Sequence, residues 1–423
     1  MTSNFEYAVE MPPQSPEMEV FGGRYILKWH DRQIKMTVDR FLARNYKVEA
    51  EVTVEFLNRP EGQRLITKGR PELLSTFRTM IADCEDFGGE VIDKKDWKIM
   101  FKQMSILVLD RYRQGEPVVN LSEITDQGQK PYLLSPFIYE DSPTIIYGRG
   151  GVGKSLFCLY LAVLLQTGNA ENRINTNGQK NVLYLDWEAD PAESKHRASM
   201  IARGMRISED INIHYRFCTV PLALDVESIQ NAVADTKADL VIIDSAVPAC
   251  GGNAIDPLGV TAFSNALRSL STSERQVASL IIGHTTKVED KSGGPFGSVV
   301  WRNFARTVWE FRSPDVPNTD EIDVVLIHQK INLSKLLAPI GFRITWGAGE
   351  VKINELDARR HPSFSAEMPL GERISVLLED TGVMSPEQIE TSLGNVSLQE
   401  ITQTLSNDAR FSENGRGYEI HSL

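Results

Sequence analysis

Residues 148–155 read Gly148-Arg149-Gly150-Gly151-Val152-Gly153-Lys154-Ser155, the pattern Gly-x4-Gly-Lys-Ser. A short apolar run, Thr144-Ile-Ile-Tyr147, precedes this stretch as a buried strand would, and the apolar run from Leu156 to Leu165 follows it as a helix would. Glycines let the backbone bend until successive N–H groups face an anion, and a helix N-terminus adds a partial positive charge at the same point. The order therefore predicts a phosphate-binding loop between a strand and a helix.

The two residues that close this loop indicate which phosphate it binds. A lysine in this position reaches the β- and γ-phosphates of a nucleoside triphosphate, and the hydroxyl that follows it ligates Mg²⁺. We therefore expect the stretch from Gly148 to Leu156 to bind ATP, with Lys154 on the phosphates and Ser155 on the metal. A glycine-rich turn without this role would not need Lys-Ser at its end.

The composition is that of an ordinary globular protein with two or three domains. Apolar residues make up 41% and charged residues 24% of the 423 residues, and a chain of this length exceeds one typical core. No apolar run approaches the ~20 residues of a membrane helix, and the start of the chain has no secretory-signal pattern. The four cysteines form no Cys-x-x-Cys pair and the seven histidines show no metal-ligand spacing, so we expect a cytoplasmic protein with reduced thiols.

The first part of the chain divides into a tail and a small domain. Residues 1–18 are polar and rich in proline, which predicts disorder. Residues 19–136 predict a small α+β domain and a connector, because stretches of alternating apolar and polar residues come first and helical periodicity follows. The stretches are Arg24–Trp29 and Val48–Phe56 for strands, and Pro71–Cys84 and Lys95–Tyr112 for helices.

Residues 137–358 predict an α/β fold. Strands and helices alternate at first, which favours a mostly parallel sheet covered on both faces, and the last strands follow one another closely, which favours an antiparallel edge. The expected strands are Thr144–Tyr147, Asn181–Leu185, Ile211–Phe217, Leu240–Ile243, Ser279–Gly283, Thr307–Phe311, Asp323–His328 and Phe342–Trp346.

Residues 359–423 show three short helical stretches and then a hairpin with a glycine-rich turn. This order predicts a winged-helix-like domain, and a small helical packing domain is the alternative. The segment contains no lysine and more acidic residues than arginines. We therefore expect it to contact protein rather than DNA.

Two carboxylates are candidates for the chemistry of ATP hydrolysis. Asp244 ends an apolar strand downstream of the loop, where it would hold the Mg²⁺ shell through water, but Ser245 rather than glutamate follows it. Glu188 follows another strand, which we expect beside the strand that leads into the loop, and there it would orient or deprotonate the attacking water. Asp186 is the alternative base, and capping of the helix near Pro191 is the alternative role for both acids.

Further polar residues follow the next strands. His284 ends a strand and would touch the γ-phosphate, although a lone histidine is more often structural. Arg302 and Arg306 are spaced i,i+4 if the helix after Ser298 extends that far, and either could reach a neighbouring subunit's γ-phosphate as an arginine finger.

At these residues the chain resembles the RecA-fold ATPases, the family that includes the RepA-type hexameric replicative helicases of plasmids. The matching stretches are Gly148–Ser155, Leu185–Pro191, Ile242–Ser245, Gly283–Lys287 and Gly297–Arg306. The stretch Pro295–Glu310 is also similar to prokaryotic AAA-family ATPases with an added N-terminal domain. The resemblance implies a RecA-like core, assembly into a ring or filament (a hexamer in the helicases), and a finger role that falls on Arg306.

The resemblance also implies work on single-stranded DNA. We expect a translocase or helicase for replication or repair of a mobile element or phage, with residues 246–257 and 285–297 as pore loops. Lys287 and Lys291 would contact phosphates there. The formal net charge of −12 counts against a surface that coats DNA, so the grip would be local. The alternative is an ATP-driven oligomeric switch whose outer domains bind a protein partner, with no role at membranes in either case.

Overall fold

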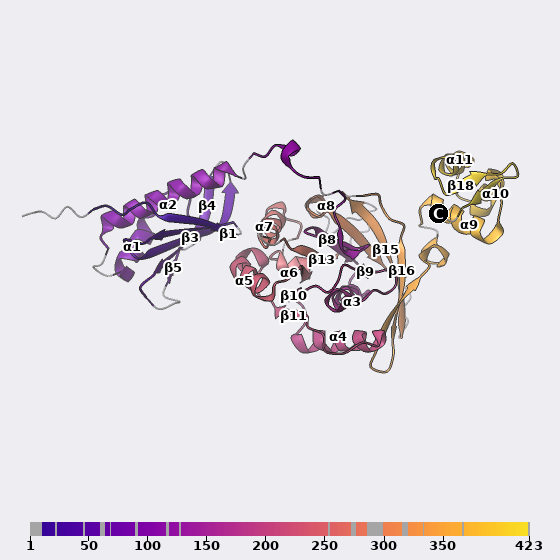
Figure 1. Ribbon diagram of the computed structural model, residues 1–423, viewed down its shortest axis with the longest axis horizontal. Coiled ribbons are helices and arrows are strands. Elements are labelled where there is room, and N and C mark those ends of the chain that lie inside the picture. Colours follow the sequence, from indigo (N-terminus) through magenta and orange to yellow (C-terminus); the bar gives the residue numbers. More distant parts are fainter. Residues whose placement is uncertain are drawn as a thin grey trace, which may run out of the picture. The chain divides into compact units, whose positions relative to one another are not determined.

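The computed structural model of the chain describes residues 11–21, 23–44, 47–59, 64–67, 69–88, 92–115, 118–126, 128–252, 254–271, 276–285, 299–314, 320–332, 334–365 and 368–421. The chain forms two compact units, the first mainly from Met1–Gly128 and the second mainly from the residues after it (Figure 1). None of the helices in the described ranges is long and apolar enough to cross a membrane.

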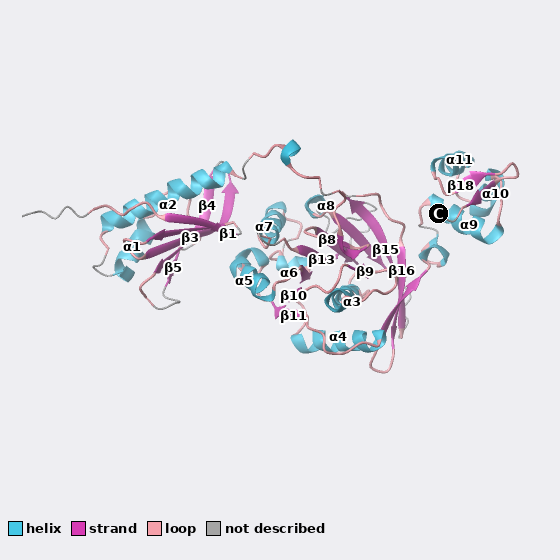
Figure 2. Ribbon diagram, viewed as in Figure 1, coloured by secondary structure: helices cyan, strands magenta, loops and turns pink. Residues whose placement is uncertain are grey.

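The described part of the first unit is an antiparallel sheet with two helices on one face (Figures 1 and 2). The alternation expected for Val48–Phe56 is confirmed, because Ala50, Val52, Val54 and Phe56 point into the core and their neighbours do not. Helices α1 (Arg78–Gly88) and α2 (Lys94–Gln114) cover these side chains. In chain order the elements are β1 (Glu17–Phe21), β2 (Arg24–Trp29), β3 (Ile34–Arg44), β4 (Lys47–Phe56), β5 (Arg64–Ile66), α1 (Arg78–Gly88) and α2 (Lys94–Gln114).

Two expectations for this unit are corrected. The first helix begins at Arg78 rather than Pro71, because residues 71–73 hydrogen-bond to β4: Ala50 N donates to the Pro71 carbonyl and Leu73 N to the Val48 carbonyl. The disorder expected for residues 1–18 does not extend to the described residues 11–18. Residues 11–14 hydrogen-bond to β-turn and helix side chains, as where Arg32 Nη2 donates to the Met11 carbonyl at 2.6 Å, and β1 begins at Glu17. Residues 1–10 lie outside the described part.

The second unit is built on a sheet that has nine strands within the described residues, in the order β11-β10-β12-β13-β8-β14-β15-β16-β17. The neighbours from β11 to β14 run parallel, and those from β14 to β17 run antiparallel, so the expected mostly parallel sheet with an antiparallel edge is confirmed. The strands are β8 (Pro143–Gly148), β10 (Val182–Asp186), β11 (His214–Phe217), β12 (Leu240–Asp244), β13 (Ala278–His284), β14 (Thr307–Arg312), β15 (Glu321–Ile331), β16 (Ile340–Trp346) and β17 (Val351–Leu356).

Burial explains why the central strands are continuous apolar runs. Every residue of β10 and β12 is buried, because helices cover the sheet. On one face of the sheet, Tyr184, Ile242 and Leu280 pack with helices α3 (Lys154–Thr167) and α4 (Pro191–Met205). The helices of this region are α3 (Lys154–Thr167), α4 (Pro191–Met205), α5 (Val226–Thr236), α6 (Ala246–Ala249), α7 (Pro257–Arg268) and α8 (Val299–Phe304).

Smaller elements complete the second unit. Strands β6 (Tyr132–Ser135), β7 (Ile138–Tyr139) and β9 (Asn175–Thr176) pair with one another, and β17 is an edge strand that the sequence pattern did not predict. After η5 (Ala358–Arg360), the C-terminal segment forms α9 (Leu370–Thr381), α10 (Pro386–Leu393), α11 (Leu398–Asn407) and the hairpin β18 (Phe411–Glu413) and β19 (Tyr418–Ile420) around an apolar cluster of its own. Capping boxes at Ser385 and Ser397 start α10 and α11. That this segment is winged-helix-like stays a prediction.

Candidate functional site

The loop predicted to bind phosphate lies between β8 and α3. Gly148 ends β8, and a Cβ there would come within 2.1 Å of the Phe311 carbonyl oxygen on β14, so no side chain fits. Gly153, the residue before α3, has φ of +91°, which a residue with a side chain rarely adopts. The chain thus wraps the amino end of α3, and α3 begins at Lys154. This is the strand–loop–helix order that the sequence predicted.

Lys154 lies within this loop and is only 4% exposed. Its Nζ donates hydrogen bonds to the Gly148 carbonyl at 3.0 Å and the Arg149 carbonyl at 2.6 Å, and it lies 3.4 Å from His284 Nδ1. Burial lowers the pKa of Lys154 to about 8. An anion in the loop would raise this pKa again, because the negative charge favours the protonated amine.

Asp244 ends β12 and lies at the same edge of the sheet as the loop. The side chain is 4% exposed, and Oδ2 accepts a hydrogen bond from the Tyr184 hydroxyl at 2.7 Å. Burial raises the pKa of Asp244 to about 6, although hydrogen bonds from Tyr184 and Ser155 oppose the rise. The two residues predicted as metal ligands, Ser155 and Asp244, are therefore neighbours.

Both of these ligands are hard oxygen donors, which fits Mg²⁺. The described residues contain no group of three His, Cys, Asp or Glu side chains that could hold a metal ion by themselves. Mg²⁺ in nucleotide sites keeps several waters and takes only one or two protein ligands, with the substrate phosphates completing its shell. The pair Ser155 and Asp244 meets that requirement without a larger cluster.

Glu188 and Asp186, the two candidate bases, have different environments. Asp186 is 2% exposed, and its Oδ1 accepts hydrogen bonds from Glu188 N at 2.8 Å and Ala189 N at 2.9 Å, so it fixes the turn after β10. The N-cap of α4 is Asp190, so the capping role that was the alternative for Asp186 and Glu188 belongs to neither of them. Glu188 Oε1 instead accepts a short hydrogen bond from the Ser245 hydroxyl and lies 3.7 Å from His284 Nε2. The His284 contact, with help from Ser245, lowers the pKa of Glu188.

The strand order differs from one expectation about Glu188. Strand β10 is not beside β8, because β12 and β13 lie between them. Glu188 still reaches the loop region, since the carboxyl ends of β8, β10, β12 and β13 meet at one edge of the sheet. His284, at the end of β13, lies between Lys154 and Glu188 and contacts both.

Arg306 lies at the opposite edge of the sheet. Its backbone N donates a hydrogen bond to the carbonyl of Pro143, the first residue of β8. The loop begins at the other end of this strand, at Gly148, which is about 17 Å from Pro143 at ~3.3 Å per residue. The exposed Arg306 side chain therefore does not serve the loop of its own chain. Helix α8 ends at Phe304, so Arg302 and Arg306 do not share a helix as the spacing allowed.

Other predicted residues are only partly placed. Lys287 and Lys291 lie outside the described residues. Of the two expected pore loops, residues 246–249 form α6, and the second is described only at Thr285. Tyr184, which binds Asp244, was not predicted; its only signal in the sequence is a tyrosine in an otherwise aliphatic strand.

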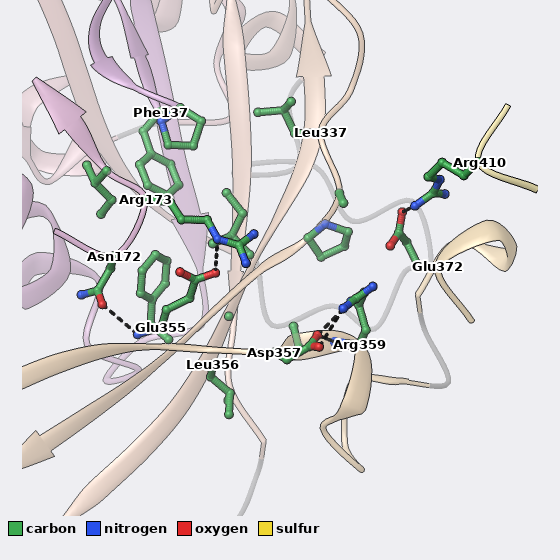
Figure 3. A pocket seen from close by; sticks show the side chains of 18 residues that line it. Phe137, Asn172, Arg173, Leu337, Glu355, Leu356, Asp357, Arg359, Glu372 and Arg410 are labelled. Atoms are coloured by element: carbon green, nitrogen blue, oxygen red, sulfur yellow. Dashed lines mark hydrogen bonds and ion pairs between the residues drawn. The ribbon is translucent and has the colours of Figure 1, made fainter. Parts of the chain in front are cut away.

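The pocket drawn in Figure 3 is a different site. Its volume is about 690 Å³ and its lining includes no residue of the loop. Three arginines in it are paired with carboxylates: Arg173 with Glu355 at 2.8 Å, Arg359 with Asp357 at 2.9 Å, and Arg410 with Glu372 at 2.8 Å. Because these charges are compensated, the pocket does not compete with the loop as a phosphate site.

Residues 118–290 match the family model described as "AAA domain". The matched range contains the loop, Glu188, Asp244 and His284, and it ends before Arg306. The match and the loop geometry together support a P-loop ATPase. No curated protein matches the chain. Among solved structures, the chain is similar to the RadB recombinase, at 14% identity and a TM-score of 0.39, over 52% of this chain and 92% of that one. A TM-score of this size does not define a shared fold.

Proposed function

We propose that this protein is a Mg²⁺-dependent ATP hydrolase with a RecA-like core. One observation carries the proposal: Lys154, His284 and Glu188 form a chain of contacts beside the Ser155–Asp244 pair. A lysine for phosphates, an oxygen pair for Mg²⁺ and a carboxylate for water are the parts that hydrolysis of a nucleoside triphosphate requires.

Each side chain has a role that follows from its surroundings. Lys154 exchanges its two carbonyl partners for oxygens of the β- and γ-phosphates. Ser155 and Asp244 would hold Mg²⁺, which when bound neutralises charge on the phosphate oxygens. Glu188 has a lowered pKa and is therefore ionised at neutral pH, so it can accept a hydrogen bond from the attacking water and orient it. His284 contacts both Lys154 and Glu188, so loss of the γ-phosphate changes its surroundings.

We further propose that the protein assembles with itself and that Arg306 completes the neighbour's site. Within one chain Arg306 lies at the wrong edge of the sheet, and its side chain is exposed. In a ring or filament the same edge can face the loop of the next subunit. Work on single-stranded DNA through Lys287 and Lys291 is the output we propose, and a switch that binds a protein partner is the alternative, which the acidic net charge favours.

Glu188→Gln tests the site. This variant should bind ATP with Mg²⁺ as the wild type does and hydrolyse it on the order of 10²–10⁴ times more slowly, the usual effect of losing a general base. Phosphate release measures turnover, and a fluorescent ATP analogue measures binding. Glu193→Gln, the same change on α4, is the matched control and should keep full turnover. Normal turnover in Glu188→Gln, or in Lys154→Ala, would exclude the assignment.

A further inference from the structure

The first unit carries a groove that has no part in the proposed hydrolysis. It has a volume of about 850 Å³ and lies between the segment before α1, the start of α1 and one side of α2. The floor is apolar and buried, while Leu74 and Ile106 at its margin are 63% and 47% exposed. The lining residues are Leu73, Leu74, Ser75, Thr76, Phe77, Arg78, Ile81, Lys94, Lys98, Phe101, Lys102, Ser105 and Ile106.

The rim of this groove is basic, in a chain whose net charge is −12. Arg78, Lys94, Lys98 and Lys102 line it and are exposed, and no acidic residue is among the lining residues. Lys94 pairs with Glu85 at 2.7 Å, and among the described residues no carboxylate pairs with the other three. Around its apolar floor, the groove therefore presents three positive charges that no described carboxylate compensates, those of Arg78, Lys98 and Lys102.

Two local features fix the geometry of the groove. Phe77 has φ of +47°, which is rare for a bulky residue, and its ring stacks on Phe101 with centroids 5.0 Å apart. This turn sets the floor and starts α1, whose first turn contains no acidic residue. The lysines of α2 recur every four residues, so they form a row that spans about 12 Å at 1.5 Å per residue.

We infer that this groove binds an acidic amphipathic helix of a partner protein. Carboxylates four residues apart on such a helix would face the row Lys94, Lys98 and Lys102, and its apolar side chains would cover Leu74 and Ile106. A single strand of nucleic acid fits less well, because strands bind by stacking bases on exposed aromatic rings, and both rings of this floor are buried. The inference concerns the first unit and is independent of the proposed hydrolysis.

A peptide selection on the full chain tests the inference. A displayed library of random 16-residue peptides is selected against the wild type and against the double variant Lys98→Glu/Lys102→Glu. Peptides enriched on the wild type should carry Asp or Glu at four-residue spacing between apolar residues, and the double variant should not enrich them. Enriched peptides with no acidic excess, or the same peptides on both proteins, would overturn the inference.

Fluorescence anisotropy with the best enriched peptide gives the magnitude. Lys98→Glu should raise its Kd at least ~tenfold, and added salt should weaken binding, because the contacts are charge pairs at the edge of an apolar patch. Arg113→Glu, the same charge change on α2 outside the groove, should leave Kd unchanged. Leu74→Ser removes exposed apolar contact without disturbing the core and should also weaken binding. If a 20-nucleotide thymidine strand or phosphatidylserine vesicles bound through the same lysines more tightly than the peptide does, the result would contradict a protein partner. Basal ATP hydrolysis should be unaffected in every one of these variants.

Discussion

Asp244→Asn should make the protein more stable and less active, and the structure gives the size of the first effect. Burial raises the pKa of Asp244 from its ordinary 3.8 to about 6, which is about two pH units, or about 3 kcal/mol at 1.36 kcal/mol per unit. A carboxyl whose pKa is raised on folding binds more protons when folded. Stability therefore falls as the pH rises from about 4 to about 6, and the full loss is present at neutral pH.

Asparagine is neutral at every pH and can still accept the Tyr184 hydrogen bond. Without Mg²⁺ and nucleotide, Asp244→Asn should therefore be more stable than the wild type at pH 7 by up to about 3 kcal/mol. A unit of 150–250 residues would gain about 6–12 °C in Tm, and the second unit, which is larger, should gain about 6 °C. The difference should shrink as the pH falls and be small near pH 4, where the wild-type carboxyl is protonated in the folded state and about half protonated in the unfolded state.

Differential scanning calorimetry from pH 4 to pH 8 in a chelator measures this difference. Addition of Mg²⁺ and ATP should raise the Tm of the wild type more than that of the variant, because the variant lacks the carboxylate that we propose as a metal ligand. Asp186→Ala is the control and should lower the Tm, because it removes the Oδ1 atom that accepts two backbone hydrogen bonds. A lower Tm for Asp244→Asn at pH 7, or a difference that does not vary with pH, would refute the reasoning.

Three further predictions concern the same machinery. Arg306→Ala should bind nucleotide normally and hydrolyse it roughly 10³ times more slowly. Mixing this variant with Lys154→Ala should restore activity if the arginine finger acts between subunits. A co-assembled mixture without activity would show that Arg306 takes no part in hydrolysis. ATP binding above pH 8 should take up a proton, because the pKa of Lys154 is about 8 in the free protein and the triphosphate raises this pKa. Calorimetry in two buffers of different ionisation enthalpy measures the proton uptake, and Lys154→Ala should lack it. Single-stranded DNA should raise the rate of ATP hydrolysis at low salt. The double variant Lys287→Ala/Lys291→Ala should lose this increase and keep its basal hydrolysis. A hydrolysis rate that no nucleic acid changes would favour the protein-binding switch.

Local sequence was enough to predict the loop and the central strands. The order of strand, glycines, Lys154 and helix is a property of neighbouring residues, and Gly148 and Gly153 occupy positions that only glycine fits. Fully buried parallel strands need continuous apolar runs, so β10 and β12 are visible in the sequence. The start of α1 was wrong, because residues 71–73 pair with β4 and that pairing depends on residues far away along the chain.

The sequence by itself determined that a glycine-rich loop ending in Lys154 and Ser155 lies between a strand and a helix, and that Asp244, Glu188 and His284 end or follow strands. Only the tertiary structure decided which of these side chains meet. The order of β8, β13, β12 and β10 brings His284 between Lys154 and Glu188, and it leaves Asp186 to fix a turn. It also places Arg306 at the far edge from the loop. Such distances depend on how strands are ordered in the sheet, and strand order is set by packing between distant segments rather than by spacing along the chain.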